Sequence, residues 1–381
     1  MTDCTSYAKV GSNGAENAGG GEDRKTTTPG GAGSMSLRRI RSPVELDEAL
    51  AATSDNAAFL GAHYGLLIQK QNRFPEATWL NWAYKSKSGD PLFCLLRSYS
   101  FQPRVTPIMY FFCEPTVFFE REAAWPIFDA IAAEAPLFFQ HDGSVVVGVP
   151  PITNEYEAWF IERYPSKCLE HFPCHYYYMS PAQRTSLIDD SKAGIPIPDE
   201  YFFDKANLEH DADLIASTWR HSGHGELDYT KAKIRAMPSS LIRHKLTQLP
   251  AAFEMTDAGG FLTHHYTMPE HRRKGLGEAV EKDICRKLIN EGFVPSKDVE
   301  TFNEAVLSAS NKSPYWTRWE VADEPVVMTF LKHVAKESEI VLPADTGSGN
   351  NTNASAEHSG GASAEAETSP TSPPTSPNGD K

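Results

Sequence analysis

Hydrophobic and polar positions follow helical and strand patterns from about Ser36 to Leu342. Apolar residues every three or four positions predict helices that face a core, and short apolar runs between turn residues predict buried strands. Ser42 and Pro43 form an N-cap and first-turn pair that marks the start of the first helix. In the first part of this region, the patterns predict helices at 43–50 and 125–133, and strands at 92–99, 108–113, 145–149 and 175–179.

The second part of the region has a clearer pattern. A tight turn at 256–260 separates two apolar strands. Because helices and strands are interleaved, the order predicts a mixed α/β (α+β) fold. The predicted helices are 211–221, 229–236, 277–290 and 303–310, and the predicted strands are 251–255, 261–268, 293–299, 316–321 and 325–331.

The two ends of the chain differ from the middle. Residues 1–35 are rich in Gly, Thr and Asn, and 343–381 end in Ser-Pro repeats, so neither segment can bury enough apolar area to order itself. We expect both to be disordered tails. The polar, proline-rich stretch at 189–200 predicts a linker between a first domain at 36–188 and a second at 201–342.

Composition and charge argue against several classes of protein. The formal net charge is −14 and the pI is about 5.4, with no long basic block, which argues against a nucleic-acid partner. The six cysteines form no CxxC pair and are expected to be reduced thiols of an intracellular protein. The sequence lacks a secretory signal and a membrane-spanning apolar run. His171, Cys174 and His175 have no fourth ligand at motif spacing, so no metal site is expected.

A glycine-rich, basic loop carries the strongest chemical signal. It follows a strand that ends at Met268 and precedes the helix at 277–290. Glycines allow a ligand to approach the backbone, and the N–H groups and dipole of a helix start favour phosphate. The loop therefore predicts a diphosphate site, although its spacing is neither GxxxxGK[ST] nor GxGxxG. Its residues are Pro269, Glu270, His271, Arg272, Arg273, Lys274, Gly275, Leu276 and Gly277.

The pattern Arg272-x-x-Gly275-x-Gly277 resembles the phosphate loop of the GCN5-related N-acetyltransferase (GNAT) superfamily. The landmarks at 219–223, 238, 253–257, 269–272 and 303–305 are similar, in their order, to those of the glycine N-acyltransferase family. This resemblance covers about 201–319 well and 36–188 only loosely. It implies two tandem GNAT-like acyltransferase domains, the first degenerate, and transfer of an acyl group from acyl-CoA to the amine of glycine or another small amino acid.

The resemblance also implies which residues hold acyl-CoA, the co-substrate. Backbone donors for the tetrahedral oxyanion are expected from the strand end near 266–268. The cysteine pattern and the N-terminal composition predict a cytoplasmic protein, and the resemblance implies the mitochondrion as the alternative. The implied cofactor-binding residues are Tyr266, Met268, Arg272, Arg273, Lys274, Gly275, Leu276, Gly277 and Asn303.

The general base is the point where the sequence departs from the family. The family's catalytic Glu follows the glycine of the hairpin turn, where this chain has Phe261. Strand alternation places Phe261, Thr263 and His265 on one side and His264 on the other. An imidazole titrates near neutral pH, so His265 is the candidate base.

Weaker candidates for the base are Glu254 and Asp257, and Tyr315 is a candidate to protonate the leaving thiolate. Two alternatives stay open. One is a catalytically silent acyl-CoA-binding or scaffold protein, which the missing Glu favours. The other is an acetyltransferase of a different amine.

Overall fold

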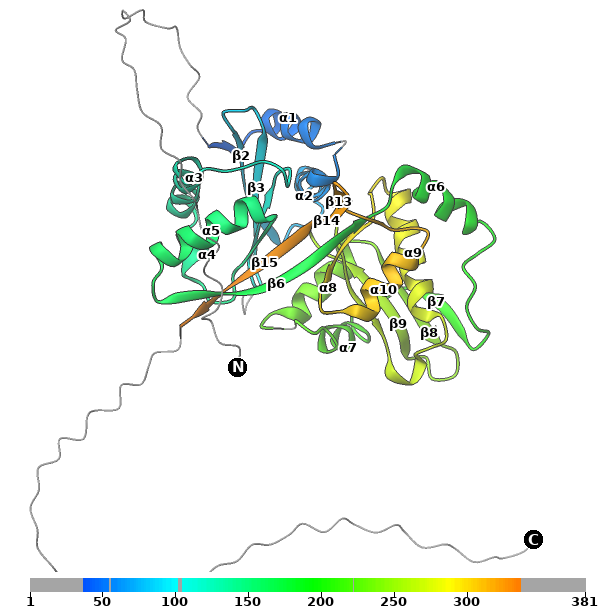
Figure 1. Cartoon of the computed structure of the whole chain (residues 1–381). Coiled ribbons are helices and arrows are strands. Elements are labelled where there is room, and N and C mark those ends of the chain that lie inside the picture. Colours follow the sequence, from blue (N-terminus) through cyan, green and yellow to red (C-terminus); the bar gives the residue numbers. More distant parts are fainter. Residues whose placement is uncertain (1–36, 55, 102–104, 222, 337–381) are drawn as a thin grey trace, which may run out of the picture. The chain divides into compact units, whose positions relative to one another are not determined.

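The computed structural model describes residues 37–54, 56–101, 105–221 and 223–336. The segments expected to be disordered, 1–35 and 343–381, lie outside the described residues. Within the described ranges, no helix is both long enough and apolar enough to cross a lipid bilayer. The mixed α+β fold expected from the sequence is confirmed by a large mixed sheet, a second four-stranded sheet and the helices that cover them (Figure 1).

The first helix of the N-terminal half begins where it was predicted. Ser42 Oγ accepts from the Glu45 N–H, and the Ser42 N–H donates to the Glu45 carboxylate, which completes a capping box at the start of α1. The elements of this half are β1 (Arg38–Ile40), α1 (Pro43–Thr53), η1 (Ala57–Phe59), α2 (Leu60–Lys70), β2 (Ala77–Lys85), β3 (Pro91–Tyr99), β4 (Ile108–Phe112), α3 (Arg121–Glu134), α4 (Pro136–Gln140), β5 (Val145–Gly148), α5 (Pro150–Arg163), β6 (Lys167–Tyr178) and α6 (Pro181–Asp190).

The C-terminal half contains most of the predicted elements, several of them shorter than expected. The strands predicted at 261–268 and 293–299 cover Leu262–Thr267 and Ser296–Glu300, and the strand predicted at 316–321 is divided into two two-residue strands. The helix predicted at 211–221 ends at Ser217, because the Thr218 hydroxyl bonds back to the carbonyl groups of Leu214 and Ile215. The elements are β7 (Tyr201–Asp204), α7 (Ala212–Ser217), α8 (Glu226–Ala236), β8 (Ser239–His244), β9 (Pro250–Thr256), β10 (Leu262–Thr267), η2 (Pro269–His271), α9 (Leu276–Asn290), β11 (Ser296–Glu300), α10 (Glu304–Lys312), β12 (Thr317–Arg318), β13 (Glu320–Val321), β14 (Glu324–Pro325) and β15 (Val327–Ala335).

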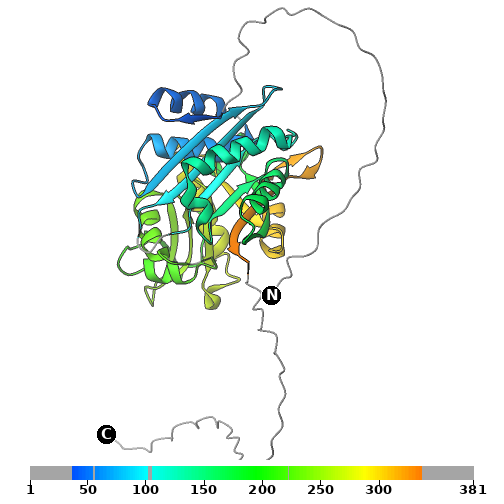
Figure 2. The ribbon, with the colours of Figure 1, turned by 90° about the vertical axis from the view of Figure 1, so that its left-hand side faces the viewer.

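The large sheet combines strands from both halves in the order β1-β2-β3-β4-β5-β15-β6-β11. Strand β15 is antiparallel to both β5 and β6, and β11 is antiparallel to β6. Figure 1 shows β15 in orange beside β6 in green, and Figure 2 shows the teal helices of the N-terminal half across its strands. The large sheet therefore contains strands from both sides of the linker predicted at 189–200. The domain division at that linker stays a prediction.

The second sheet has the order β10-β9-β8-β7, so β10 and β11 lie in different sheets although α9 connects them directly. Their starts are close, since a Cβ on Gly260 would lie 3.7 Å from Phe293 Cδ1. Along their lengths β10 pairs with β9 and β11 pairs with β6, so no ladder joins β10 to β11 among the described residues. We call this break in the ladder, at the end of β10 that leads to the start of α9, the gap between β10 and β11. In the N-terminal half, β4 and β5 are instead paired in parallel.

The turn between β9 and β10 packs into the N-terminal half. Asp257 accepts a hydrogen bond from Arg97 at 2.6 Å, and the Phe261 ring stacks on Tyr110 with 5.5 Å between centroids. A Cβ on Gly61 would lie 2.5 Å from Phe261 Cζ, so only glycine fits beneath this ring. Phe261 thus acts as a packing residue between the halves.

A buried histidine on β15 predicts acid sensitivity. His333 is 0% exposed, and burial lowers its pKa from 6.5 to about 3. Its Nε2 lies 2.8 Å from the Tyr156 hydroxyl, and its ring stacks on Phe160. The folded state resists protonation, so the stability that His333 contributes is complete above pH 6.5 and is lost as the pH falls toward 3.

We therefore expect the free energy of unfolding of the wild type to fall by about 1.4 kcal/mol per pH unit more than that of His333→Gln below pH 6.5. Gln keeps an acceptor for the Tyr156 hydroxyl but does not titrate. Urea denaturation of both proteins at several pH values measures the difference. Parallel stability curves would contradict the assignment.

Candidate functional site

The glycine-rich loop leads into an uncapped helix. Gly275 is the N-cap of α9 with φ of +78°, and no side chain caps the helix. Because the first N–H groups of a helix have no intrahelical partner, those of the first turn of α9 remain available to a ligand. The positive φ explains the glycine at 275. Together these features form an anion-binding arrangement at the open end of the gap between β10 and β11.

The three cations of the loop differ in their contacts. Arg272 Nε donates to the carbonyl oxygen of Thr267 at 3.0 Å, and Lys274 Nζ donates to the Tyr201 hydroxyl at 2.7 Å. Arg273 is exposed, has φ of +61°, and makes no hydrogen bond or ion pair with the described residues. Leu276 is buried, so it can offer a ligand only its backbone. Arg273 is therefore the loop cation with a side chain free for a phosphate.

A β-bulge changes the faces expected along β10. Thr263 pairs with Met255 and Tyr266 pairs with Phe253, so two residues, His264 and His265, oppose one residue of β9. His264 has φ of +54°. The expected alternation is therefore wrong, because His265 no longer shares a side with Thr263.

The two histidines point to opposite sides of the sheet, as expected. His264 is buried against Trp219 and lies 3.2 Å from the Thr218 hydroxyl. Burial lowers its pKa to about 3. His265 faces α9, where a Cβ on Gly277 would lie 3.0 Å from its Nε2. The candidate base is thus next to the start of the phosphate-loop helix.

The backbone donors expected near 266–268 differ in whether their N–H groups are already engaged. The N–H of Met268 already donates to the carbonyl oxygen of Ala251 at 2.9 Å. The carbonyl group of Thr267 accepts from Arg272, so Thr267 directs its peptide groups away from β9. Within 266–268, Thr267 is therefore the residue whose N–H points toward the gap.

A buried polar network surrounds His265. Its Nδ1 lies 3.7 Å from Glu254 Oε2, on the neighbouring strand β9. Glu281, on α9, forms an ion pair with Lys297 on β11, and Trp316 Nε1 donates to the same carboxylate at 3.1 Å. The network therefore connects β9, β10, α9 and β11.

The network shifts the pKa values of its members in opposite directions. Burial, together with the Glu281 charge, raises the pKa of Glu254 well above its usual range. Burial disfavours the Glu281 anion, but the Lys297 charge outweighs this effect and lowers the pKa of Glu281. Burial also lowers the pKa of His265, whose side chain is 37% exposed. His265 is thus held neutral and able to accept a proton.

Glu254, His265 and Glu281 could also hold a metal ion, because their ligand atoms lie within 4.8 Å of one another. The ammonium group of Lys297 already pairs with Glu281. A metal ion would have to displace this internal cation, so we assign the three residues to the polar network.

Two other predicted residues are engaged in local structure. Asn303 caps α10 and accepts a hydrogen bond from the Val306 N–H at 3.5 Å. The Tyr315 hydroxyl donates to Asp190 at 2.7 Å, and this carboxylate raises the pKa of Tyr315 to about 12. Tyr315 is therefore a poor proton donor to a thiolate.

Sequence analysis missed three polar residues beside the gap, which are Glu281, Lys297 and Asp298. Glu281 lies one helical turn after Gly277, a spacing that places it under the same helix face. Lys297 and Asp298 interrupt a short apolar strand with two charges. Charged residues within a buried strand were the signal that could have identified both.

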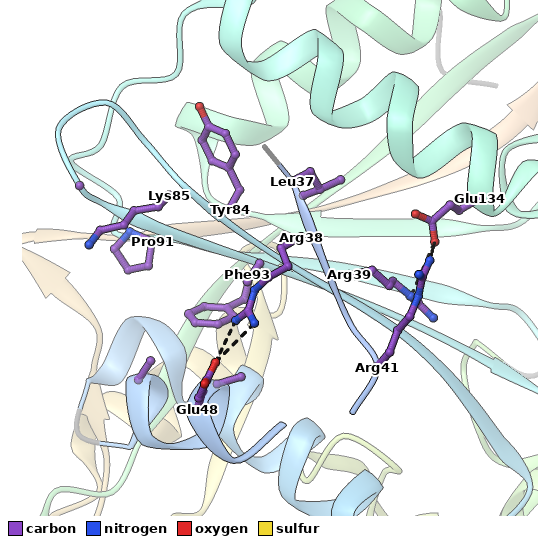
Figure 3. Close-up of a pocket in the computed structure, with 14 residues that line it drawn as sticks. Leu37, Arg38, Arg39, Arg41, Glu48, Tyr84, Lys85, Pro91, Phe93 and Glu134 are labelled. Carbon is purple, nitrogen blue, oxygen red and sulfur yellow. Dashed lines mark hydrogen bonds and ion pairs between the residues drawn. The ribbon is translucent and has the colours of Figure 1, made fainter. Parts of the chain in front are cut away.

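A separate hollow of about 990 Å³ lies beside β1. In Figure 3, Arg38 pairs with Glu48 and Arg41 pairs with Glu134, at 3.4 Å and 3.6 Å respectively. Its lining comes from residues 37–134 and includes no residue expected to bind the cofactor.

Comparison with known proteins bears on the fold. No protein-family model matches the sequence. The chain is similar to an X-ray structure of a Drosophila protein, with a TM-score of 0.61 and 16% identity over 78% of this chain and 98% of that one. It also resembles a tandem GNAT protein of the clavulanic acid pathway, with a TM-score of 0.46 and 11% identity over 78% of this chain and 98% of that one.

A GCN5-related N-acetyltransferase from Kribbella flavida has a TM-score of 0.43 and 14% identity over 73% of this chain and 96% of that one. The structural neighbours of this mixed α+β chain thus include GNAT proteins, one of them a tandem GNAT protein, at low sequence identity.

Proposed function

We propose that the chain is an acyl-CoA-dependent N-acyltransferase that transfers an acyl group to the amine of glycine or another small amino acid. The observation that carries the proposal is the uncapped start of α9 behind Gly275, at the open end of the gap between β10 and β11. A diphosphate at these N–H groups would direct the rest of the coenzyme into the gap. The loop residues and Asn303 named from the sequence are the proposed cofactor contacts.

The gap offers what acyl transfer needs. The Thr267 N–H can stabilise the oxyanion that forms on the thioester carbonyl. His265, held neutral beside Glu254, is the base proposed from the sequence. Holding the amine and the thioester together supplies a further part of the rate enhancement.

A silent acyl-CoA-binding protein is the second candidate. The packing of Phe261 between the halves favours it, because the position of the family's Glu is filled by a ring that cannot titrate. Such a protein would bind coenzyme A without turnover.

Two measurements on the full chain separate these proposals. Calorimetric titration with CoA tests the diphosphate site, and release of free thiol from acetyl-CoA or benzoyl-CoA with a panel of amino acids tests transfer. Binding with thiol release for one amine supports the enzyme. Binding without release across the panel supports the silent protein, and absence of binding contradicts both.

Arg273 gives a prediction with two readouts. Replacing it by glycine should relieve about 1 kcal/mol of backbone strain at φ of +61°, and so raise thermal stability. The same change should weaken CoA binding about tenfold, because a charge-assisted contact to phosphate is lost. Arg273→Lys, which keeps the charge, is the control and should bind nearly as well as the wild type. Equal affinity of all three proteins would show that Arg273 does not contact the ligand.

A further inference from the structure

Asp298 lies on the wall of the gap that β11 forms. In the register of β11 with β6, Asp298 is opposite Tyr176, and the neighbouring Lys297 is opposite Tyr177. Lys297 faces α9, where it pairs with Glu281. Because side chains alternate along a strand, Asp298 faces the other way, on the same side as its partner Tyr176.

One polar atom on this side, Asp298 Oδ1, is buried and has no hydrogen-bonding partner among the described residues. The Tyr176 side chain is 5% exposed, and its hydroxyl group is within hydrogen-bonding reach of Ser296. Buried polar groups are nearly always hydrogen bonded, so the unsatisfied carboxylate oxygen of Asp298 indicates a missing ligand. A carboxylate oxygen suits an ammonium or amine nitrogen.

The charged groups around Asp298 leave its carboxylate uncompensated. The closest carboxylate in the turn, Asp257, already holds the guanidinium of Arg97 at 2.6 Å. Tyr110, on β4, and Cys174, on β6, also face Asp298, and burial raises the pKa of both. Among the residues that the structure describes, Asp298 therefore forms no ion pair with a cation.

Burial, with the nearby Asp257 charge, raises the pKa of Asp298 from 3.8 to about 7. A group with such a pKa accepts and returns a proton readily near neutral pH. This value supports the geometric argument for a role in proton transfer.

Asp298 lies close to the position at which the family has its catalytic Glu. Phe261, which stands where the family has its Glu, is 8% exposed and lies 6.3 Å from the Tyr176 ring, measured between centroids. Tyr176 in turn is the cross-strand neighbour of Asp298. Asp298 thus places a carboxyl group on the facing wall of the same gap.

We infer that Asp298 binds the acceptor ammonium and takes its proton. This inference rests on the proposed function and moves the proton-accepting role proposed there for His265 to Asp298. The N–H proton passes to a carboxylate oxygen of Asp298, and the nitrogen lone pair then attacks the thioester carbon. The C–S bond breaks, and the thiolate takes the second proton from nitrogen. The products are an amide, free CoA thiol and one proton, which Asp298 returns to water.

The test compares wild type, Asp298→Asn and His265→Ala in thiol release with acetyl-CoA and the amine that the wild type accepts. Asn keeps the shape of Asp, and CoA affinity with thermal melting verifies folding. We expect Asp298→Asn to lower kcat about 10²- to 10⁴-fold with CoA affinity within about twofold of wild type. The rise of kcat/KM around pH 7 that is expected for the wild type should be absent in the variant.

The matched control is Glu300→Gln on the same face of β11, since Glu300 is already paired with Arg220 and His221 and should keep kcat within about threefold. An active wild type whose kcat and pH profile survive Asp298→Asn overturns this inference alone. If only His265→Ala removes the rise of kcat/KM around pH 7, this inference is likewise overturned and the proposed function stands. A wild type that binds CoA but accepts no amine overturns the proposed function, and this inference with it.

Discussion

An Arg97→Ala variant is expected to lose about 3–5 kcal/mol of unfolding free energy, because it leaves Asp257 buried without its partner charge. The two side chains are 4% and 13% exposed, and their atoms are 2.6 Å apart. Asp257 also accepts hydrogen bonds from the N–H groups of Gly259 and Phe261, so it cannot turn to solvent without breaking the turn. Urea denaturation measures the loss.

Two further variants are the controls for the Arg97→Ala measurement. Lys332→Ala breaks an exposed ion pair with Glu170 at 3.0 Å and should cost less than about 1 kcal/mol. The double variant Arg97→Met/Asp257→Asn removes both charges and keeps a side-chain oxygen that can accept the turn's N–H groups, so it should recover part of the loss. If Arg97→Ala is no less stable than Lys332→Ala, the ion pair does not hold the halves together.

A Gly277→Val variant is expected to bind CoA about 100-fold more weakly, which corresponds to the loss of two charge-assisted hydrogen bonds to phosphate. A Cβ at 277 would lie 3.0 Å from His265 Nε2 and 3.3 Å from Thr267 Oγ1. The additional methyl groups of valine would push the start of α9 away from β10. The N–H groups of its first turn would then no longer converge on one diphosphate.

Gly223→Val is the matched control, because a Cβ there meets no atom within 4 Å. It should leave CoA affinity unchanged in the same calorimetric titration. Thermal melting of both variants distinguishes a displaced helix from an unfolded chain. Wild-type CoA affinity in a folded Gly277→Val protein would contradict a phosphate site at the start of α9.

Local signals predicted the elements that depend on few residues. The Ser42–Glu45 capping box fixes the start of α1, and Gly275 with the apolar spacing after it fixes α9. Because such signals act within one or two turns, a single sequence contains them completely. For the same reason the phosphate loop could be recognised as a feature without knowledge of the fold.

The features that the sequence did not predict depend on contacts between residues that are distant in the sequence. The bulge at His264 exists because Glu254 of another strand faces two residues, and strict alternation cannot reveal it. Strand β6 begins at Lys167, eight residues before the strand predicted at 175–179, because β15 pairs with it from Lys167 onward. Asp298 likewise gains its environment from the turn at Asp257 and from Tyr176, so its own segment shows only an acidic residue in a strand.

The insertion of β15 between β5 and β6 has a consequence for biosynthesis. The sheet of the N-terminal half stays incomplete until residues 327–335 have left the ribosome. The nascent chain must therefore carry an open slot between β5 and β6 while residues 179–326 are translated, although domains usually fold one after another as they emerge. Such an exposed pair of strand edges is a binding site for chaperones and a risk for aggregation.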